Sequence, residues 1–246
     1  MPDALFDTQR LAEIYDLVEG ERDDLDHYLA IAAELGARSV LDVGCGTGTL
    51  ACLLADRGVE VVGVDPAAAS LKIARAKPGA GRVRWLHGDA ATLPELQVDL
   101  ATMTANVSHV ILTDDDWSAT LGGIHAALRP GGHLVFEARD PARRAWLEWN
   151  RDGTYQRLDA PGVGAVETWW DLTGVNGEYV SYRRTYVFAA DGTTLVSDST
   201  RRFRSRAEIE GSLRSAGYTL VDVHDAPDRP NYEWIFVARK LLAVRS

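Results

Sequence analysis

The sequence predicts an α/β fold: a doubly wound, mainly parallel sheet with an antiparallel β-rich insertion after its fifth strand. Short apolar runs rich in valine alternate with helical patterns through the first 140 residues, as in parallel sheets that are buried on both faces. From about residue 141, three β-rich segments joined by turn signals replace this alternation. A chain of 246 residues is long enough for one α/β domain with an insertion, or for two tightly packed domains.

The first half of the chain supplies most of the expected sheet. We expect strands at residues 39–44, 59–65, 82–88, 98–104 and 133–138. We expect helices between them at residues 47–57, 67–76 and 115–128. Thr113 or Asp114 caps the last of these helices, and Arg129-Pro130-Gly131-Gly132 ends it. This alternation gives right-handed crossovers and a doubly wound sheet.

The second half contains the insertion and the end of the sheet. Its β-rich segments are residues 165–172, 179–188 and 193–204, with turns at Asn176-Gly177 and Asp191-Gly192. A helix then begins at Ser205, with Glu208 three residues later, and ends at Gly217. Strands follow at residues 218–224 and 232–238. The expected units are an N-terminal helical cap (1–38), a ligand-binding core (39–140), a β insertion that forms a lid (141–204) and the C-terminal helix and strands (205–246).

The charge argues against a nucleic-acid substrate. The formal net charge is −10, and ten acidic residues within positions 1–36 face only Arg10 and Arg22. Such a surface repels phosphate backbones. One basic cluster, Arg201, Arg202, Arg204 and Arg206 around Phe203, is either a solvated strand face or a phosphate-binding patch. We favour the solvated face, because charge runs usually keep a surface wet.

The two cysteines and the apolar segments carry no special chemistry. Cys45 and Cys52 are seven residues apart, which fits neither a metal site nor a disulfide framework. No basic stretch followed by an apolar run opens the sequence, and no run of 18 apolar residues occurs. We therefore expect a cytoplasmic protein with no metal and no membrane contact.

The segment SVLDVGCGTGTLACLLADRGVEVVGVD, residues 39–65, indicates a ligand-binding edge. Glycines at 44, 46 and 48 let a ligand approach the backbone after the first strand. A dinucleotide-binding loop would have its third glycine at position 49, which is Thr49, and Asp42 would repel a pyrophosphate. Asp65 ends the second strand, where a carboxylate can accept hydrogen bonds from both ribose hydroxyls. Asp89 follows the third strand and can accept from an exocyclic amine. Three acids on one edge suit a cationic adenosine.

These motifs resemble those of class I S-adenosylmethionine-dependent methyltransferases. VLDVGCGTGTL, VVGVD, GDAATLP and LRPGGHLVFEARD match the family's motifs in order over roughly residues 38–140. The resemblance implies a Rossmann-like sheet of seven strands whose last strand is antiparallel, and S-adenosyl-L-methionine as the cofactor. It places Asp42 and two glycines near the methionine end, Asp65 on the ribose, and Asp89 with the Ala90 amide on adenine. The full set of expected cofactor-binding residues is Tyr15, Arg22, Asp42, Gly44, Cys45, Gly46, Gly48, Asp65, Pro66, Asp89, Ala90, Thr104 and Asn106.

The segment after the fourth strand borders the transferring methyl group in this family. Thr104 or Asn106 could touch the cofactor, and His109 is our candidate general base, although a loop histidine that only hydrogen bonds to backbone is an equal alternative. The segment lacks the Asn/Asp-Pro-Pro-Tyr/Phe signature of many nucleic-acid amino methylases. This absence and the acidic charge favour a small-molecule acceptor.

The β insertion resembles the coverings that small-molecule members of the family place over the active site. Its aromatic residues suit an apolar pocket or form the insertion's own core: Trp146, Trp149, Trp169, Trp170, Tyr179 and Tyr182. Arg139, Arg143 and Arg183 either bind an acidic acceptor group or are ordinary surface arginines.

The favoured function is methyl transfer to an oxygen or nitrogen atom of a small molecule. Two other functions remain open: a catalytically silent cofactor- or partner-binding protein, because a fold does not establish turnover, and an NAD-dependent oxidoreductase. The sequence does not identify the acceptor or the oligomeric state.

Overall fold

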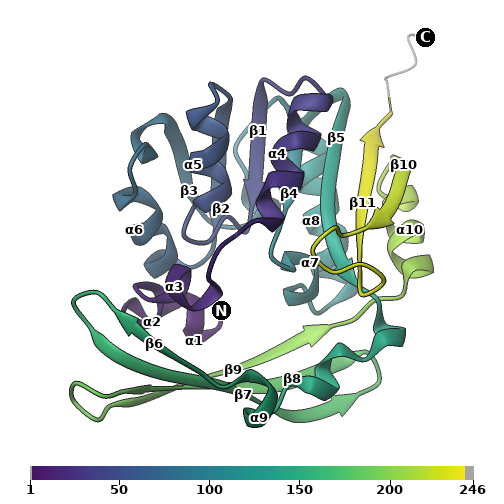
Figure 1. Cartoon of the computed structure of the whole chain (residues 1–246). Helices are drawn as coiled ribbons and strands as arrows, with labels where there is room; N and C mark the ends of the chain where they lie inside the picture. Colours follow the sequence, from purple (N-terminus) through teal and green to yellow (C-terminus); the bar gives the residue numbers. More distant parts are fainter. Residues whose placement is uncertain (1, 242–246) are drawn as a thin grey trace, which may run out of the picture.

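The computed structural model describes residues 2–241, whose main body is a seven-stranded sheet with helices on both faces (Figure 1). The strands lie in the order β3-β2-β1-β4-β5-β11-β10. β11 pairs antiparallel with both of its neighbours, whereas the other pairs are parallel. This confirms the predicted fold. The strands are β1 Ser39–Val43, β2 Glu60–Asp65, β3 Val83–His87, β4 Val98–Met103, β5 Leu128–Arg139, β10 Tyr218–Asp225 and β11 Glu233–Lys240.

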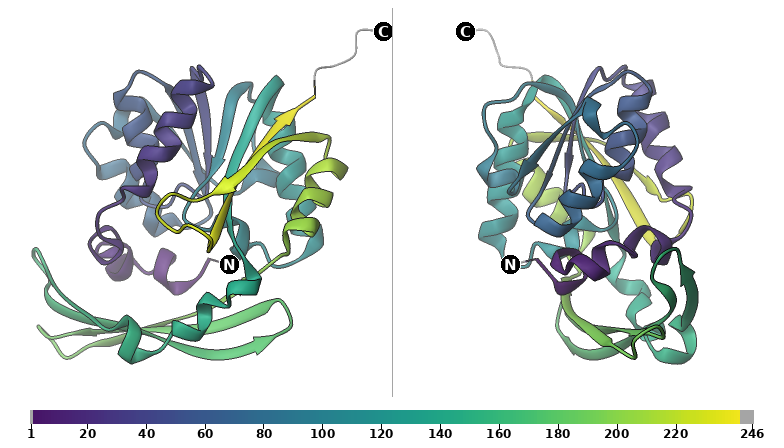
Figure 2. Two further views of the ribbon diagram at one scale, coloured as in Figure 1. Left: turned by 45° about the vertical axis from the view of Figure 1, so that its right-hand side comes forward. Right: turned by 90° about the vertical axis from the view of Figure 1, so that its left-hand side faces the viewer.

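Helices cover the two faces of this sheet with separate apolar clusters (Figure 2). One face carries α4 (Asp24–Glu34), α5 (Thr49–Asp56) and α6 (Ala68–Ala76), and the other carries α8 (Asp114–Ala127) and α10 (Arg206–Ser215). The predicted caps are present: the Thr113 hydroxyl accepts from the Asp116 amide, and Ser205 and Glu208 bond reciprocally. The shorter helical pieces are η1 Ala80–Arg82, η2 Ala90–Thr92, α7 Val107–Val110, η3 Pro141–Arg143, η4 Ala145–Glu148 and α9 Arg151–Thr154.

Strand β5 begins earlier than the sequence predicts. Helix α8 ends at Ala127, as the Pro-Gly-Gly stretch indicates, but residues 129–132 continue directly as strand. Val98 pairs with Leu128 and Leu100 with His133, so this stretch bulges out of the pairing with β4. The Pro-Gly-Gly stretch therefore follows the end of the helix but forms part of the strand and not a separate turn.

A second sheet of four antiparallel strands lies below the carboxyl ends of the parallel strands (Figure 1). We call it the lid; its strands are β6 Gln156–Ala160, β7 Gly164–Asn176, β8 Tyr179–Phe188 and β9 Thr194–Arg202. β7, β8 and β9 were predicted. The turn between β8 and β9 contains the predicted Asp191-Gly192, whereas the turn between β7 and β8 is Gly177-Glu178, because Asn176 still pairs with Tyr179. β6 was not predicted, because it is a largely exposed edge strand without a regular apolar alternation.

Two arginines of the basic cluster join the lid to the sheet core, which corrects the prediction of a solvated face. Arg202 and Arg204 are only 6% and 3% exposed. Helix α7 and the chain after it leave carbonyl oxygens that need donors, and the two guanidinium groups supply them. Their bonds end at the carbonyl oxygens of Ser108, Leu112 and Thr113 and at the carboxylates of Asp114 and Glu178. Spacing along the sequence cannot reveal carbonyls that lie 90 residues away.

Three short helices lie between the sheet and the lid (Figure 2). They are α1 (Ala4–Asp7), α2 (Gln9–Ala12) and α3 (Tyr15–Glu19). Buried apolar residues of this region, including Leu11, Ile14 and Val18, pack against Tyr186 and Phe188 of the lid. No helix in residues 2–241 has the length and apolar character needed to span a membrane.

Candidate functional site

The glycine loop, residues 44–48, joins β1 to α5 through left-handed backbone. Gly44, Gly46 and Gly48 have φ angles of +69°, +53° and +78°. A Cβ on Gly48 would lie 2.4 Å from Cη2 of Trp85, so a glycine here lets α5 pack against β3. A Cβ on Gly46 would meet nothing within 4 Å. The loop thus combines a tightly packed turn with a stretch of bare backbone that faces open space.

Asp65 lies beside this loop, as predicted. It is 7% exposed, and its two carboxylate oxygens accept from the amides of Gly46 (2.8 Å) and Ala67 (2.7 Å). Burial raises the pKa of Asp65, and the two amide bonds oppose that shift. Each carboxylate oxygen has a second acceptor site, so these bonds fix the carboxylate and leave it able to bind a hydroxyl. Pro66, the next residue, is exposed.

Asp42, on β1, is more deeply buried at 2% exposure. Its Oδ1 accepts from the hydroxyl of Thr102 at 3.0 Å. Burial is the main cause that raises the pKa of Asp42 to about 7, and the charge of Asp65 adds to the shift. A carboxylate in this position gains stability from a neighbouring cation.

Asp89 has a local structural role at the start of η2. Its Oδ1 accepts from the amides of Ala91 (3.0 Å) and Thr92 (3.1 Å), and Thr92 bonds back to its amide. Asp89 is exposed and Ala90 is buried. Asp89 thus forms a capping box, a pattern that the sequence GDAAT specifies. Its contact with adenine stays a prediction.

Helix α3 is tied to the glycine loop by a polar cluster that the sequence did not indicate. The Thr47 hydroxyl donates to Asp16 at 2.5 Å. Lys77, after α6, lies 2.6 Å from the other oxygen of Asp16 and 2.7 Å from the Thr49 hydroxyl. These contacts hold the N-terminal helices against the loop and place Tyr15 close to it in the chain.

The segment after β4 has an unusual backbone. Ala105 and Asn106 both have positive φ angles, +59° and +63°, which non-glycine residues rarely adopt. The Asn106 amide donates to Oε1 of Glu137 at 2.7 Å, which supports this turn. The side-chain Oδ1 of Asn106 is buried and has no hydrogen-bond partner among the described residues. Thr104, just before it, is buried.

A cavity of about 260 Å³ lies between this segment, the lid and the N-terminal helices; we call it the lid cavity. Both predicted cofactor contacts from the N-terminal region, Tyr15 and Arg22, line it. Its walls combine aromatic rings with paired charges. The lining includes Phe6, Tyr15, Arg22, Ala105, Asn106, His109, Glu137, Arg139, Trp149, Trp170, Tyr182, Arg184, Phe203, Arg229 and Glu233.

His109 lines the lid cavity but has both ring nitrogens engaged by backbone. Nδ1 lies 2.7 Å from the Arg202 carbonyl oxygen and therefore carries the proton, while Nε2 accepts from the Arg139 amide at 2.9 Å. Burial lowers the pKa of His109 to about 3. A general base needs a free lone pair, and both nitrogens are committed here. This geometry supports the alternative for His109, a histidine that holds backbone in place.

Tyr15 and Arg22 approach the lid cavity from α3 and the chain after it. Arg22 makes two parallel bonds to Asp24, of 2.8 and 2.7 Å. Burial raises the pKa of Tyr15 far above its ordinary value, so its hydroxyl stays protonated. Both residues line the lid cavity. Their direct contact with the cofactor stays a prediction.

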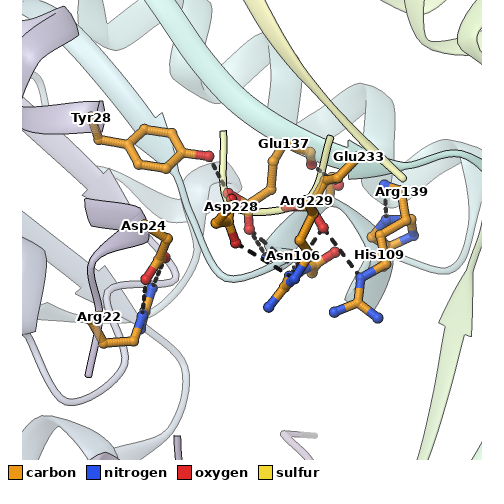
Figure 3. A network of polar contacts seen from close by, with 11 residues as sticks. Arg22, Asp24, Tyr28, Asn106, His109, Glu137, Arg139, Asp228, Arg229 and Glu233 are labelled. Carbon is orange, nitrogen blue, oxygen red and sulfur yellow. Dashed lines mark hydrogen bonds and ion pairs between the residues drawn. The ribbon is translucent and has the colours of Figure 1, made fainter. Parts of the chain in front are cut away.

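A network of acids and arginines forms the floor of the lid cavity (Figure 3). Glu137, on β5, is 4% exposed and accepts from the Tyr28 hydroxyl as well as from the Asn106 amide. Glu233, on β11, pairs with Arg139 at 3.3 Å and with Arg229 at 3.2 Å. Glu137 was not among the predicted site residues, although an acid inside the apolar run HLVFEAR is a usable signal.

The predicted aromatic residues divide between the lid cavity and the lid itself. Trp149, Trp170 and Tyr182 line the cavity, and the last two rings stack with centroids 4.8 Å apart. Trp146 packs in the same cluster, beneath Phe203. Trp169 bonds to Asp171 and Tyr179 to the Leu112 carbonyl, and neither is part of the cavity lining.

The three predicted acceptor arginines are all paired with acids. Arg139 lines the lid cavity, whereas Arg143 pairs with Asp140 and Arg183 with Asp198, both outside its lining. Residues 2–241 contain no cluster of three His, Cys, Asp or Glu side chains that could hold a metal ion. Cys45 and Cys52 are free thiols.

Comparison with known proteins gives consistent matches. Residues 40–132 match the model of a methyltransferase domain. A demethylmenaquinone methyltransferase of Thermus thermophilus is 38% identical over 194 residues, which is 77% of this chain and 78% of that protein. A cypemycin N-terminal methyltransferase of a Streptomyces species is 34% identical over 134 residues, 53% of this chain and 55% of that protein. The chain thus spans about half the length of some curated relatives. A solved S-adenosylmethionine-dependent methyltransferase of Clostridium acetobutylicum has the same fold, with a TM-score of 0.77, 18% identity and coverage of 95% of this chain and 99% of that one.

Proposed function

Because the chain belongs to the class I S-adenosylmethionine-dependent methyltransferases, we propose that it methylates an oxygen or nitrogen atom of a small molecule bound in the lid cavity. The observation that carries this proposal is the position of the cavity. One wall is formed by Ala105 and Asn106, after β4, and the opposite wall by aromatic residues of the lid. An acceptor there would be enclosed next to the segment that borders the methyl group in this family.

The size of the cavity supports a small acceptor. A volume of about 260 Å³ is near the lower end of small-ligand sites, which are roughly 300 to 1,000 Å³. The lid and the N-terminal helices form two of its sides, and the net charge of −10 opposes a nucleic acid. A folded protein or a duplex would not fit beneath the lid.

The edge formed by Asp42, the glycine loop, Asp65 and Asp89 suits the cofactor; we call it the acidic rim. The open space beside Gly46 and the unpartnered Oδ1 of Asn106 leave room and an acceptor for a ligand. Asp65 would bind the ribose hydroxyls, and Asp42 would favour the positive sulfonium end. When bound, the cofactor supplies a methyl carbon on a positively charged sulfur.

The reaction asks mainly for alignment. The acceptor's lone pair forms the new bond to carbon while the carbon–sulfur electron pair returns to sulfur. Holding the two reactants in line is worth roughly 7 to 11 kcal/mol in favourable cases. The enclosed cavity can supply this alignment because its walls are made by packed helices and strands.

The names of the relatives leave the acceptor open. One relative is named for the N-terminus of cypemycin and the other for demethylmenaquinone. The two names refer to different acceptors, so we assign neither acceptor to this chain.

Thermal unfolding with four ligands in parallel tests the cofactor: S-adenosylmethionine, S-adenosylhomocysteine, NAD⁺ and NADP⁺. A ligand at 100 times its dissociation constant stabilises by about 2.7 kcal/mol, or roughly 5 to 10 °C for a chain of this size. We expect this shift with the first two ligands only. A shift with NAD⁺ alone would replace the methyltransferase proposal with an oxidoreductase. Binding without release of S-adenosylhomocysteine from any pool of small metabolites would identify a silent binding protein.

A further inference from the structure

Glu137 is a buried carboxylate that lacks a cation of its own. Its oxygens accept from the Tyr28 hydroxyl and the Asn106 amide, both neutral donors. Among the described residues, no basic side chain lies within ion-pair distance of it. A buried carboxylate is costly unless it is paired or protonated. Glu137 therefore needs either a proton or a positively charged ligand.

The arginines that line the lid cavity are paired with other acids. Arg22 pairs with Asp24, Arg184 with Glu19 and Arg201 with Asp3, and Arg139 and Arg229 share Glu233. Arg229 also lies 3.6 Å from Asp228. On this side of the cavity, Glu137, Glu233 and Asp228 outnumber Arg139 and Arg229 by one negative charge.

The surroundings of Glu137 also set its affinity for a proton. Burial is the main cause that raises the pKa of Glu137, and the charge of Glu233 raises it further. The Tyr28 and Asn106 bonds and the charge of Arg229 oppose the shift. His109, which also lines the lid cavity, stays neutral because burial lowers its pKa to about 3. Among the residues that line the lid cavity, Glu137 is thus an acid whose raised pKa favours proton exchange.

The wall opposite Glu137 is aromatic. Trp149, Trp170, Tyr182 and Phe203 line the lid side of the cavity. Aromatic faces favour both apolar groups and cations. Arg184 lies 5.2 Å above the Trp170 ring, so this wall already holds a cation at its edge. The cavity therefore suits a ligand with an apolar body and one positive group directed to the floor.

We infer that the acceptor is a small amine, whose ammonium group Glu137 binds and deprotonates before methyl transfer. This inference rests on the proposed function and narrows it from oxygen or nitrogen to nitrogen. It also gives Glu137 the role of base that the sequence analysis assigned to His109.

The steps balance in protons and electrons. The ammonium R–NH₃⁺ gives one proton to the Glu137 carboxylate, which leaves R–NH₂ with a free lone pair. That lone pair forms the N–C bond as the carbon–sulfur pair returns to sulfur. The products are R–NH₂⁺–CH₃ and the neutral thioether, and the protonated Glu137 later releases its proton to solvent.

The first experiment supplies tritiated methyl donor and two pools of small molecules, one of primary and secondary amines and one of alcohols, phenols and carboxylic acids. Label in the amine pool is the expected result. Label in the hydroxyl and acid pool alone overturns the inference but keeps the proposed function. No label in either pool overturns both.

The second experiment uses the amine that is labelled and asks whether Glu137 acts as a base or only holds the Asn106 turn. Glu137→Gln keeps an oxygen for the Asn106 amide but cannot take a proton. We expect a 10²- to 10⁴-fold lower rate at pH 7 and an unchanged affinity for S-adenosylhomocysteine by calorimetry. Glu210→Gln, on the exposed side of α10, is the matched control and keeps the full rate.

The pH profile separates the two roles. Wild-type protein takes the ammonium form, so its kcat/KM is flat between the pKa of Glu137 and the pKa of the amine. The variant must wait for free amine, so its kcat/KM rises tenfold per pH unit up to the pKa of the amine. Parallel profiles at a constant ratio, or a loss of S-adenosylhomocysteine binding, show a structural role and overturn the inference. Tyr28→Phe keeps the carboxylate and should keep the flat profile; a rising profile in that variant contradicts the proposal as well.

Discussion

The acidic rim and the lid cavity lie side by side but are built in opposite ways. The rim depends on backbone: three left-handed glycines, two amides that hold Asp65, and a capping box at Asp89. The cavity depends on side chains that come from the N-terminal helices, β5, the lid and the turn before β11. A ligand shared by a whole family can be bound through backbone, whereas an acceptor specific to one protein requires particular side chains.

The largest effect that sharpens this comparison is expected at Gly48. Gly48→Ala places a Cβ in left-handed backbone and 2.4 Å from Trp85. We expect a loss of about 2 to 5 kcal/mol in unfolding free energy, from about 1 to 2 for the backbone and about 1 to 3 for overpacking. Gly46→Ala is the control, because its Cβ meets nothing within 4 Å. It should lose only the backbone part, and equal losses in urea unfolding would contradict the packing role of Gly48.

The attachment of the lid should give the next largest effect. Arg204→Met removes the donors to the Ser108 and Thr113 carbonyls, which are then left without partners. We expect a loss of about 2 to 4 kcal/mol, because the buried Ser108 carbonyl left without a partner costs about 1 to 3 and the part-buried Thr113 carbonyl about 1. Arg183→Met removes an exposed pair with Asp198 and should leave the denaturation midpoint at the wild-type value. Similar denaturation midpoints for the two variants would contradict the buried role of Arg204.

Asp65 tests whether the acidic rim binds the cofactor. Asp65→Ala should weaken S-adenosylmethionine by about 1.5 to 3 kcal/mol, or roughly 10- to 150-fold, since it removes hydrogen bonds to a charged group and frees the Gly46 amide. Calorimetry measures this directly. Asp152→Ala, at an exposed residue of α9, is the control. An affinity equal to that of the wild type would remove Asp65 from the site.

The smallest effect concerns His109 and pH. Its pKa is about 3 in the folded chain and 6.5 as its ordinary value. The unfolded chain therefore binds the proton first as pH falls, so His109 costs stability below pH 6.5, at about 1.4 kcal/mol per pH unit. At pH 5 this is about 2 kcal/mol. The raised pKa values of Asp42 and Glu137 act in the opposite direction, but they are present in both proteins and cancel in the comparison.

His109→Asn removes this pH-dependent cost. The unfolding free energy of the variant relative to wild type should therefore increase by about 2 kcal/mol between pH 7 and pH 5. Chemical denaturation at the two pH values measures the difference. An equal pH dependence in the two proteins would mean that His109 is not buried in its neutral form.

The contrast between the two regions also explains how far the sequence could be read. The glycine loop, Asp65 and Asp89 lie at strand ends, where local pattern fixes both conformation and place. Glu137 and Glu233 meet on the floor of the cavity from positions 96 residues apart, and no spacing rule brings them together. His109 had the right position and the wrong partners, because the backbone groups of Arg139 and Arg202 approach it only in the folded chain.

The lid is one continuous insertion between β5 and α10, so it can change in sequence separately from the rest of the fold. Residues 140–205 can diverge while the glycine loop and the acidic rim keep their sequence, so new acceptors can arise without a new donor site. Two attachments limit this freedom. Arg202 and Arg204 bond to the carbonyls after α7, and the N-terminal helices pack against Tyr186 and Phe188. An exchange of lids between relatives should therefore keep the two arginines and these two aromatic residues.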